Sequence, residues 1–249
     1  MFDRDDEIEK LRASLNEPLV VVFGLRRVGK SSLIKAVLNE YAPSNYFYID
    51  LRRFEESGYV SYRDFVKALE DSINARVRSR RLLSMLSRIR GGVSISGFRV
   101  SFSWGGRDRV MLADILDSIN DWASDEGGLR AIIVLDEAQE LVKARGGFNV
   151  LPVLAYAYDN LRNLTFIITG SEFRVFTKFL KLNDPESPLF GRAYVSITLK
   201  PFSEEQAVEF LRRGFREHGI EFDKAEEVYE ELGGNPGWLT LFGYRAWGG

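Results

Sequence analysis

Residues 20–32 read VVVFGLRRVGKSS, four apolar residues that lead into a loop framed by two glycines and closed by lysine and serine. Within this stretch, Gly24 to Ser31 match the pattern GxxxxGK followed by serine or threonine, without a gap. At ordinary amino-acid usage, a chance match somewhere in the chain has odds of about one in a hundred. A phosphate-binding loop also needs a buried strand before it and a helix after it, because loop amides and the helix N-terminus must converge on the phosphates. Both conditions are met, so the stretch predicts a phosphate-binding loop rather than a plain turn.

The lysine and serine that close this loop carry its chemistry. Lys30 is expected to neutralise the β and γ phosphates of a nucleoside triphosphate, and the Ser31 hydroxyl is expected to ligate Mg²⁺. The chain has no Asn-Lys-x-Asp element of the kind that guanine recognition needs, so the expected nucleotide is ATP or its product ADP. The candidate nucleotide-binding residues of this Walker A loop are Gly24, Leu25, Arg26, Arg27, Val28, Gly29, Lys30, Ser31 and Ser32.

A second apolar run, residues 131–137, reads AIIVLDE and ends in two carboxylates. A carboxylate at the end of a buried strand beside the phosphate loop can hold magnesium, usually through its waters, and we assign this Walker B role to Asp136. The neighbouring Glu137 is the candidate catalytic base, because a second carboxylate that faces the γ phosphate can orient and deprotonate a water. The pair favours hydrolysis over phosphoryl transfer to a small acceptor, which makes a small-molecule kinase the weakest alternative.

Three further polar residues are candidates for the catalytic site. Thr169 and Ser171 end the run TFIITGS, whose carboxyl edge should lie beside that of the Asp136 strand, where ligands bind in open parallel sheets. They could contact the γ phosphate or the attacking water, or they could be the capping hydroxyls of a turn, and both interpretations stay open. Arg192 precedes the last expected strand and could reach a γ phosphate in its own subunit or in a neighbouring one. Arginine is abundant in this chain, so an ordinary surface role for Arg192 is equally open.

The pattern of apolar runs predicts an α/β fold. Strands are expected at residues 20–23, 46–51, 131–137, 165–170 and 194–199. Helix-length segments separate them, which indicates βαβ units and a mostly parallel sheet covered on both faces. Alternating residues at 93–104, with a glycine in the middle, predict an inserted β-hairpin. We therefore expect a core over residues 1–200 and a small helical lid over 201–249, in which Ser203 and Gln206 form a capping box.

The composition limits the class of protein. A chain of 249 residues with 45% hydrophobic content can bury one large core and a small satellite. It has no cysteine, which excludes disulfides, thiolate metal sites and thiol nucleophiles and fits a reducing cytoplasm. The acidic N-terminus lacks the apolar core of a signal peptide, and the apolar runs are too short to cross a bilayer. We expect a cytoplasmic protein with no membrane partner.

The charge is uneven along the chain. Residues 76–109 hold nine arginines and one acid, a local charge of +8 that leaves −10 for the remainder, since the total is −2. Such a block can attract DNA phosphates or an acidic partner, although charge runs are more often solvated faces. The arginines are Arg76, Arg78, Arg80, Arg81, Arg88, Arg90, Arg99, Arg107 and Arg109.

Taken together, these motifs resemble those of archaeal-type P-loop ATPases related to the AAA+ and STAND NTPases. The resemblance covers nearly the whole chain: FDRDDEIEKL, GLRRVGKSSL, YFYIDLR, VLDEAQEL, ITGS, PLFGRAYVSITLKPFS and LGGNPGWL. It implies a five-stranded sheet in the order 5-1-4-3-2 with a helical lid. It also implies that Asn235 and Pro236 line the nucleotide, that Arg192 is the arginine of the box VII motif, and that Phe2 and Arg4 pack near the adenine.

The resemblance further implies a nucleotide-dependent switch, the leading hypothesis for function. One alternative is a module that holds ATP or ADP tightly with negligible turnover, and another is a DNA-associated ATPase that uses the arginine block. A protein partner, or self-association through Arg192, would complete a switch of this kind. Relatives commonly carry a winged-helix domain after the lid, so this sequence, which ends at Gly249, is either truncated before that domain or lacks it.

Overall fold

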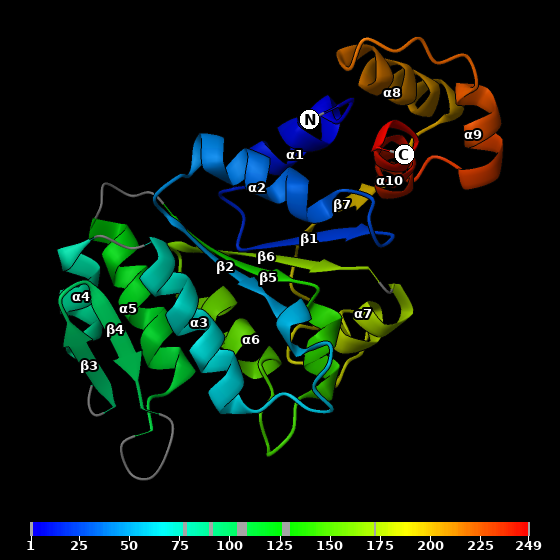
Figure 1. The fold of residues 1–249 in the computed structure, drawn as a ribbon. Helices are drawn as coiled ribbons and strands as arrows, with labels where there is room; N and C mark the ends of the chain where they lie inside the picture. The colour runs from blue at the N-terminus through cyan, green and yellow to red at the C-terminus, as the bar shows by residue number, and fades with distance from the viewer. Residues whose placement is uncertain are drawn as a thin grey trace.

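The computed structural model describes residues 2–76, 79–89, 92–103, 109–125, 130–171 and 173–248. Its centre is a parallel sheet of five strands in the order β2-β5-β6-β1-β7 (Figure 1). Counted in chain order among themselves and read from β7, these strands run 5-1-4-3-2, which confirms the expected order. The strands are β1 (Leu19–Gly24), β2 (Tyr46–Asp50), β5 (Ala131–Asp136), β6 (Leu164–Gly170) and β7 (Val195–Leu199).

The side chains on the two faces of the sheet pack in two separate apolar cores. Side chains alternate along each strand, so Val20 and Val22 of β1 pack in one core while Leu19 and Val21 pack in the other. Both β5 and β6 are buried along their whole length, as expected for central strands of a parallel sheet. Because the strands themselves are buried, a binding site is expected in the loops that follow their carboxyl ends.

Helices cover both faces of the sheet, as predicted (Figure 1). The first face carries α1 (Asp5–Ala13) and α2 (Lys30–Tyr41), and the second carries α3 (Tyr62–Arg76), α5 (Leu112–Asp125), α6 (Leu151–Asn160) and α7 (Phe173–Leu180). Two short 3-10 helices, η1 (Leu51–Phe54) and η3 (Ala138–Lys143), follow β2 and β5 directly. None of the helices within the described ranges is both long and apolar enough to cross a membrane.

An insertion lies on the outer side of α3 and α5. It holds α4 (Arg80–Leu86), which the sequence did not lead us to expect, and the antiparallel hairpin of β3 (Val93–Ser96) and β4 (Arg99–Phe102). Asn74 of α3 bonds both backbone groups of Val100, and Glu70 accepts from the Phe102 amide at 2.8 Å. These bonds hold the hairpin predicted over 93–104 against α3; Trp104, in the predicted range, lies outside the described residues.

The C-terminal helices have an apolar cluster of their own. They are α8 (Glu204–Glu217), α9 (Ala225–Leu232) and α10 (Pro236–Gly248). The Ser203–Gln206 capping box at the start of α8 is present as predicted. Phe2 packs into this cluster, which brings the N-terminus beside these helices (Figure 1). From the separate cluster we infer a lid that begins near residue 201.

Candidate functional site

The glycine loop joins β1 to α2 in the geometry that phosphate binding requires. β1 ends at Gly24, and α2 begins at Lys30 with Gly29 as its N-cap in the left-handed region, at φ 102°. A Cβ atom on Gly24 would lie 2.8 Å from the backbone oxygen of Leu199, so only glycine fits where β1 passes β7. The amides at the start of α2 therefore point into the loop, as the motif predicts.

Lys30 is folded back onto its own loop. Its Nζ donates to the backbone oxygens of Gly24 at 2.9 Å and Leu25 at 3.1 Å, and it lies 3.3 Å from Oε1 of Glu137. Burial lowers the pKa of Lys30, while the charges of Glu137 and Asp136 oppose that shift. The ammonium thus satisfies its three donors with loop carbonyls and a carboxylate, groups that phosphate oxygens can replace.

Asp136 is fully buried and accepts from hydroxyls of three different elements. Oδ2 accepts from Ser31 at 2.7 Å and from Tyr48 at 2.5 Å, and Oδ1 accepts from Thr169 at 2.6 Å. Burial and the charge of Asp136 raise the pKa of Tyr48, so that its hydroxyl stays protonated. The predicted contact between the loop serine and the strand carboxylate is therefore present.

The residues around Asp136 suit a magnesium ion. A serine hydroxyl and a carboxylate are hard oxygen ligands, and Mg²⁺ is commonly held by one or two carboxylates together with substrate phosphates and waters. Within the described ranges no group of three or more acidic, histidine or cysteine side chains could form a complete metal cage. The donor set at Ser31 and Asp136 fits a magnesium ion that is also held by nucleotide phosphates and waters.

Glu137 lies directly after β5 and is held in a fixed orientation. Its backbone is left-handed at φ 56°, and its Oε2 accepts from Ser171 at 2.5 Å and from Gln139 at 2.7 Å. Burial would raise the pKa of Glu137, but the bonds from Ser171 and Gln139 and the charge of Lys30 together lower it. The side chain is therefore an ionised carboxylate beside the phosphate loop.

The two sensor candidates contact the carboxylates. Thr169 accepts from the Glu137 amide at 2.9 Å while it donates to Asp136, and it is fully buried. Ser171 contacts Glu137 and also accepts from Gln139 at 3.3 Å. Both residues belong to the site, where they orient the acid pair.

Two residues of this network, Tyr48 and Gln139, were missed at the sequence level. Tyr48 could have been suspected, because a tyrosine on a buried strand needs a partner for its hydroxyl. Gln139 is also buried, and its amide oxygen has no hydrogen-bond partner among the described residues.

A cavity of about 240 Å³ lies between the start of α2 and the lid. Phe2 packs edge-on against Phe202 and Phe210, with ring centroids 5.6 and 5.4 Å apart, which gives the cavity an aromatic wall. Its lining consists of Phe2, Arg4, Arg27, Val28, Gly29, Ser32, Phe202, Phe210, Pro236, Gly237 and Thr240. A largely apolar hollow beside the phosphate loop fits a nucleotide base.

Arg4 has a second, structural task. Its guanidinium donates to the backbone oxygen of Lys200 at 2.7 Å, pairs with Glu7 at 2.9 Å and lies 4.7 Å from the Phe202 ring. The residue is buried. It thereby ties the N-terminal segment to the strand-to-lid connection while it lines the cavity.

The lid turn sits directly on the phosphate loop. Asn235 donates to the backbone oxygen of Arg26 at 2.9 Å, and the Gly237 amide donates to that of Arg27 at 3.1 Å. The Arg27 guanidinium lies 4.5 Å from the Trp238 ring, and Arg27 is left-handed at φ 65°. Two lid residues were expected to line the nucleotide. Pro236 lines the cavity, whereas Asn235 donates a hydrogen bond to the backbone of the phosphate loop.

Two loop side chains lie on the surface. Leu25 is 58% exposed, and Arg26 pairs with Glu55 at 2.6 Å on the surface. Their role in nucleotide binding stays a prediction.

Arg192 requires a correction. It pairs with Asp159 near the end of α6 through bonds of 3.0 and 2.5 Å. It also precedes β7, whereas the phosphate loop follows β1, and the two strands are parallel with Val20 opposite Val195. Arg192 therefore lies at the opposite edge of the sheet, and the hypothesis that it reaches the γ phosphate of its own chain is wrong.

The arginine block is only partly described. Arg81 pairs with Asp125 at 2.8 Å, Arg109 stacks 3.8 Å from the Tyr62 ring, and Arg80 lies 5.8 Å from the Phe98 ring. Arg78, Arg90, Arg107 and the side chain of Arg76 lie outside the described residues. At least two members thus have local structural partners.

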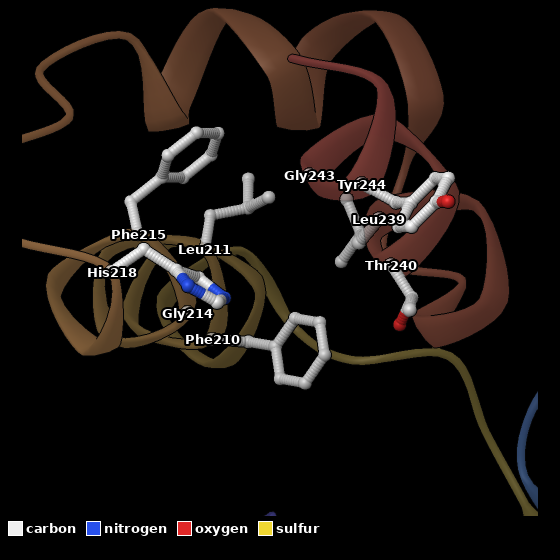
Figure 2. A pocket seen from close by; sticks show the side chains of 9 residues that line it. All are labelled: Phe210, Leu211, Gly214, Phe215, His218, Leu239, Thr240, Gly243 and Tyr244. Atoms are coloured by element: carbon white, nitrogen blue, oxygen red, sulfur yellow. The ribbon is translucent and has the colours of Figure 1, made fainter. Parts of the chain in front are cut away.

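A second, larger hollow of about 400 Å³ lies within the lid between α8 and α10 (Figure 2). Its wall is mostly apolar, and it shares Phe210 and Thr240 with the cavity beside the phosphate loop. It is lined by Phe210, Leu211, Gly214, Phe215, His218, Leu239, Thr240, Gly243 and Tyr244.

Comparisons with known proteins identify the family. Residues 1–242 match the family described as an ATPase domain predominantly from Archaea. The chain is similar to a Walker-type ATPase of Pyrococcus abyssi, with 36% identity and a TM-score of 0.79 over 100% of this chain and 69% of that one. No curated protein matches the sequence.

More distant solved structures share the fold. A STAND protein with a tetratricopeptide repeat sensor from Pyrococcus horikoshii is 17% identical, with a TM-score of 0.56 over 97% of this chain and 29% of that one. Cdc6p from Pyrobaculum aerophilum is 15% identical, with a TM-score of 0.54 over 97% of this chain and 57% of that one. At these identities the similarity concerns the fold alone.

Proposed function

The chain belongs to the family of ATPase domains found predominantly in Archaea, and we propose that it is a magnesium-dependent, ATP-hydrolysing switch of the AAA+/STAND type. One observation carries the proposal: Lys30 and Ser31 of the phosphate loop meet Glu137 and Asp136 at the end of β5, at 3.3 and 2.7 Å. This supports the proposal, because the residues expected to bind phosphate, to hold the metal and to act as the base lie within one cluster.

In this proposal the loop amides and Lys30 bind the β and γ phosphates, and Ser31 and Asp136 hold magnesium. The metal would neutralise phosphate charge and polarise the γ-phosphoryl group. Glu137 takes a proton from a water whose oxygen bonds to the γ phosphorus, while the bond from that phosphorus to the bridging oxygen of ADP breaks. The amide oxygen of Gln139, which has no hydrogen-bond partner in the described part of the chain, would accept the second hydrogen of the same water.

Nucleotide binding requires new contacts for Lys30 and Glu137 in this proposal. Lys30 donates to loop carbonyls and pairs with Glu137, so a triphosphate must draw the ammonium away from both. Glu137 is in turn held by Ser171 and Gln139. Nucleotide binding would therefore exchange one set of contacts for another, which is how a ligand shifts a two-state equilibrium.

In this proposal the lid is the part of the protein that moves in response to nucleotide. Because Asn235 and Gly237 bond to the loop backbone at Arg26 and Arg27, a change in the loop on phosphate binding would pull on the lid turn. The cavity beside the loop also has one wall from the lid, so a bound base would contact both parts. We propose that nucleotide state sets the angle between core and lid.

The test is phosphate release from ATP with and without Mg²⁺, in wild-type protein and in Glu137→Gln. The proposal expects Mg²⁺-dependent release that Glu137→Gln lowers by about a hundredfold or more while ATP remains bound. No release from wild-type protein, with nucleotide found in the purified sample, would instead favour a tight binding module. Mg²⁺-independent release that Glu137→Gln leaves unchanged would argue against this site altogether.

Self-association is proposed on the position of Arg192. At the far edge of the sheet, it could meet a γ phosphate only of a neighbouring copy, after release from Asp159. If so, turnover per chain rises with protein concentration, and Arg192→Ala removes that rise.

A second candidate function is a DNA-associated ATPase. The observation that favours it is the hairpin tip, where Phe98 is 43% exposed and lies under Arg80. One solved structure of this fold, at 17% identity and a TM-score of 0.58, is that of Drosophila ORC bound to DNA. Exposed aromatic rings and arginines suit bases and phosphates. The test is DNA binding that weakens with salt and with alanine at Arg78, Arg80 and Arg81; salt-independent or absent binding would remove this candidate.

A further inference from the structure

The hydroxyl of Tyr48 reaches the carboxylate of the proposed metal site from a neighbouring strand. It donates to Oδ2 of Asp136 at 2.5 Å, the oxygen that also accepts from Ser31 at 2.7 Å. In the parallel pairing of β2 with β5, Tyr48 lies opposite Val134 and Asp50 lies opposite Asp136. On this shared face, the long tyrosine side chain reaches diagonally along the sheet to the carboxylate.

The Tyr48 ring is fixed between the sheet and α2. The Nζ of Lys35 lies 4.7 Å from the ring centroid, and Lys35 is one helical turn after Ser31. Tyr48 also packs against the apolar core that β1 and β5 share with α2. The direction of its hydroxyl is therefore set by packing rather than left to rotate.

We propose that Tyr48 is a positioning residue of the magnesium site, which holds the Asp136 carboxylate in the orientation that faces the metal. This inference rests on the proposed function, because it presupposes magnesium-dependent nucleotide binding. A serine hydroxyl has one proton and two lone pairs, so Ser31 can donate to Asp136 while a lone pair serves the metal. Tyr48 and Thr169 then hold the two carboxylate oxygens from opposite sides, and groups that orient a metal ligand in this way tune the affinity for the metal.

The competing explanation is that the Tyr48 hydrogen bond only stabilises the fold. The chain offers a matched control in Tyr46, which lies two residues earlier on the same face of β2. Its hydroxyl donates to Asn39 near the end of α2 at 2.6 Å. Tyr46→Phe thus removes a comparable hydroxyl bond between β2 and α2 at a distance from the carboxylate.

The experiment measures the affinity for ADP and for the β,γ-imido analogue of ATP by titration calorimetry. Wild-type protein, Tyr48→Phe and Tyr46→Phe are compared in EDTA and across a series of MgCl₂ concentrations. In Tyr48→Phe we expect the Mg²⁺ concentration that gives half-maximal tightening to rise by about 10- to 100-fold. Binding in EDTA should be unchanged, which also demonstrates a folded variant, and Tyr46→Phe should behave as wild type in both conditions.

A third variant tests whether Tyr48 acts through Asp136. In an Asp136→Asn background, adding Tyr48→Phe should alter the Mg²⁺ dependence no further, since the carboxylate it positions is gone. An unchanged Mg²⁺ dependence in Tyr48→Phe, or an equal change in Tyr46→Phe, would overturn the inference and leave the proposed function standing. Wild-type protein that binds neither nucleotide would overturn both.

Discussion

The ammonium nitrogen of Lys30 lies 3.3 Å from Oε1 of Glu137, and both side chains are almost fully buried. One residue comes from the phosphate loop and the other follows β5, so the pair bridges the two motifs across the place proposed for the γ phosphate. A buried charge is costly unless it is paired. The same contact therefore stabilises the fold, and the proposed mechanism requires that ATP binding break it.

Breaking this pair from one side should destabilise the protein. Lys30→Met leaves Glu137 buried without its cation, and we expect the free energy of unfolding to fall by about 3 kcal/mol. Adding Glu137→Gln should recover much of that loss, because the charge that Lys30 contacts directly is then removed as well. Urea denaturation of the two single variants and the double variant measures the coupling. Effects that simply add would mean that the pair contributes nothing as a pair.

The Glu137 carboxylate should make stability depend on pH in one direction. Burial raises its pKa, but Ser171, Gln139 and Lys30 together lower it below the ordinary value. A carboxyl group with a lowered native pKa adds stability above its unfolded pKa, and this is lost as the pH falls through the native value. The stability difference between wild type and Glu137→Gln should therefore be largest near neutral pH and shrink below about pH 4.

Unfolding free energies measured from neutral to acid pH would check this dependence. Glu9→Gln, which removes an exposed carboxylate paired with Arg12, controls for the loss of one negative charge. A wild-type advantage over Glu137→Gln that grew on acidification would contradict the assigned direction.

Thr169 should be a structural member of the site. Its hydroxyl donates to Asp136 and accepts from the Glu137 amide, so Thr169→Val leaves two buried polar groups without that partner. We expect the free energy of unfolding to fall by about 2 kcal/mol. Thr169→Ser keeps the hydroxyl and should lose much less. A large loss in Thr169→Ser together with little loss in Thr169→Val would instead point to the methyl group, and to packing, as the reason for threonine.

The sheet and the main motifs could be predicted from the sequence because they depend on local chemistry. Ser31 and Asp136 are 105 residues apart, yet both follow buried parallel strands, whose carboxyl ends share one edge. Arg192 precedes β7, so the same rule places it at the opposite, amino-terminal ends of the strands. The position of Arg192 in the sequence, ahead of its strand, is therefore enough to separate it from the phosphate loop.

The hydrogen bonds between distant side chains could not be predicted from the sequence. The contact of Tyr48 with Asp136 depends on the register of β2 against β5, which no local pattern encodes. The contact of Asn235 with the Arg26 backbone depends on how the lid docks, over a separation of 209 residues. The sequence pointed to these segments, and the three-dimensional packing decided which atoms meet.

The docking of the lid on the phosphate loop can be tested at one glycine. A Cβ atom on Gly237 would lie 2.5 Å from the Cβ of Arg27 and 2.9 Å from its backbone oxygen, so Gly237→Ala must push the lid turn off the loop. Since the cavity beside the loop takes part of its wall from the lid, we expect ATP affinity to fall about tenfold, the equivalent of 1.4 kcal/mol. Titration calorimetry with the β,γ-imido analogue of ATP would measure this loss.

Gly243 of the same helix is the matched control. A Cβ atom there would meet nothing within 4 Å, and alanine is the better helix former by about 1 kcal/mol. Gly243→Ala should therefore keep ATP affinity and leave the protein as stable as wild type or slightly more so. If Gly237→Ala also binds ATP with wild-type affinity, the contact between the lid turn and the phosphate loop does not affect nucleotide binding. The coupling proposed between nucleotide and lid angle would then have to run through the base cavity, where Phe202 and Phe210 would be the next residues to change.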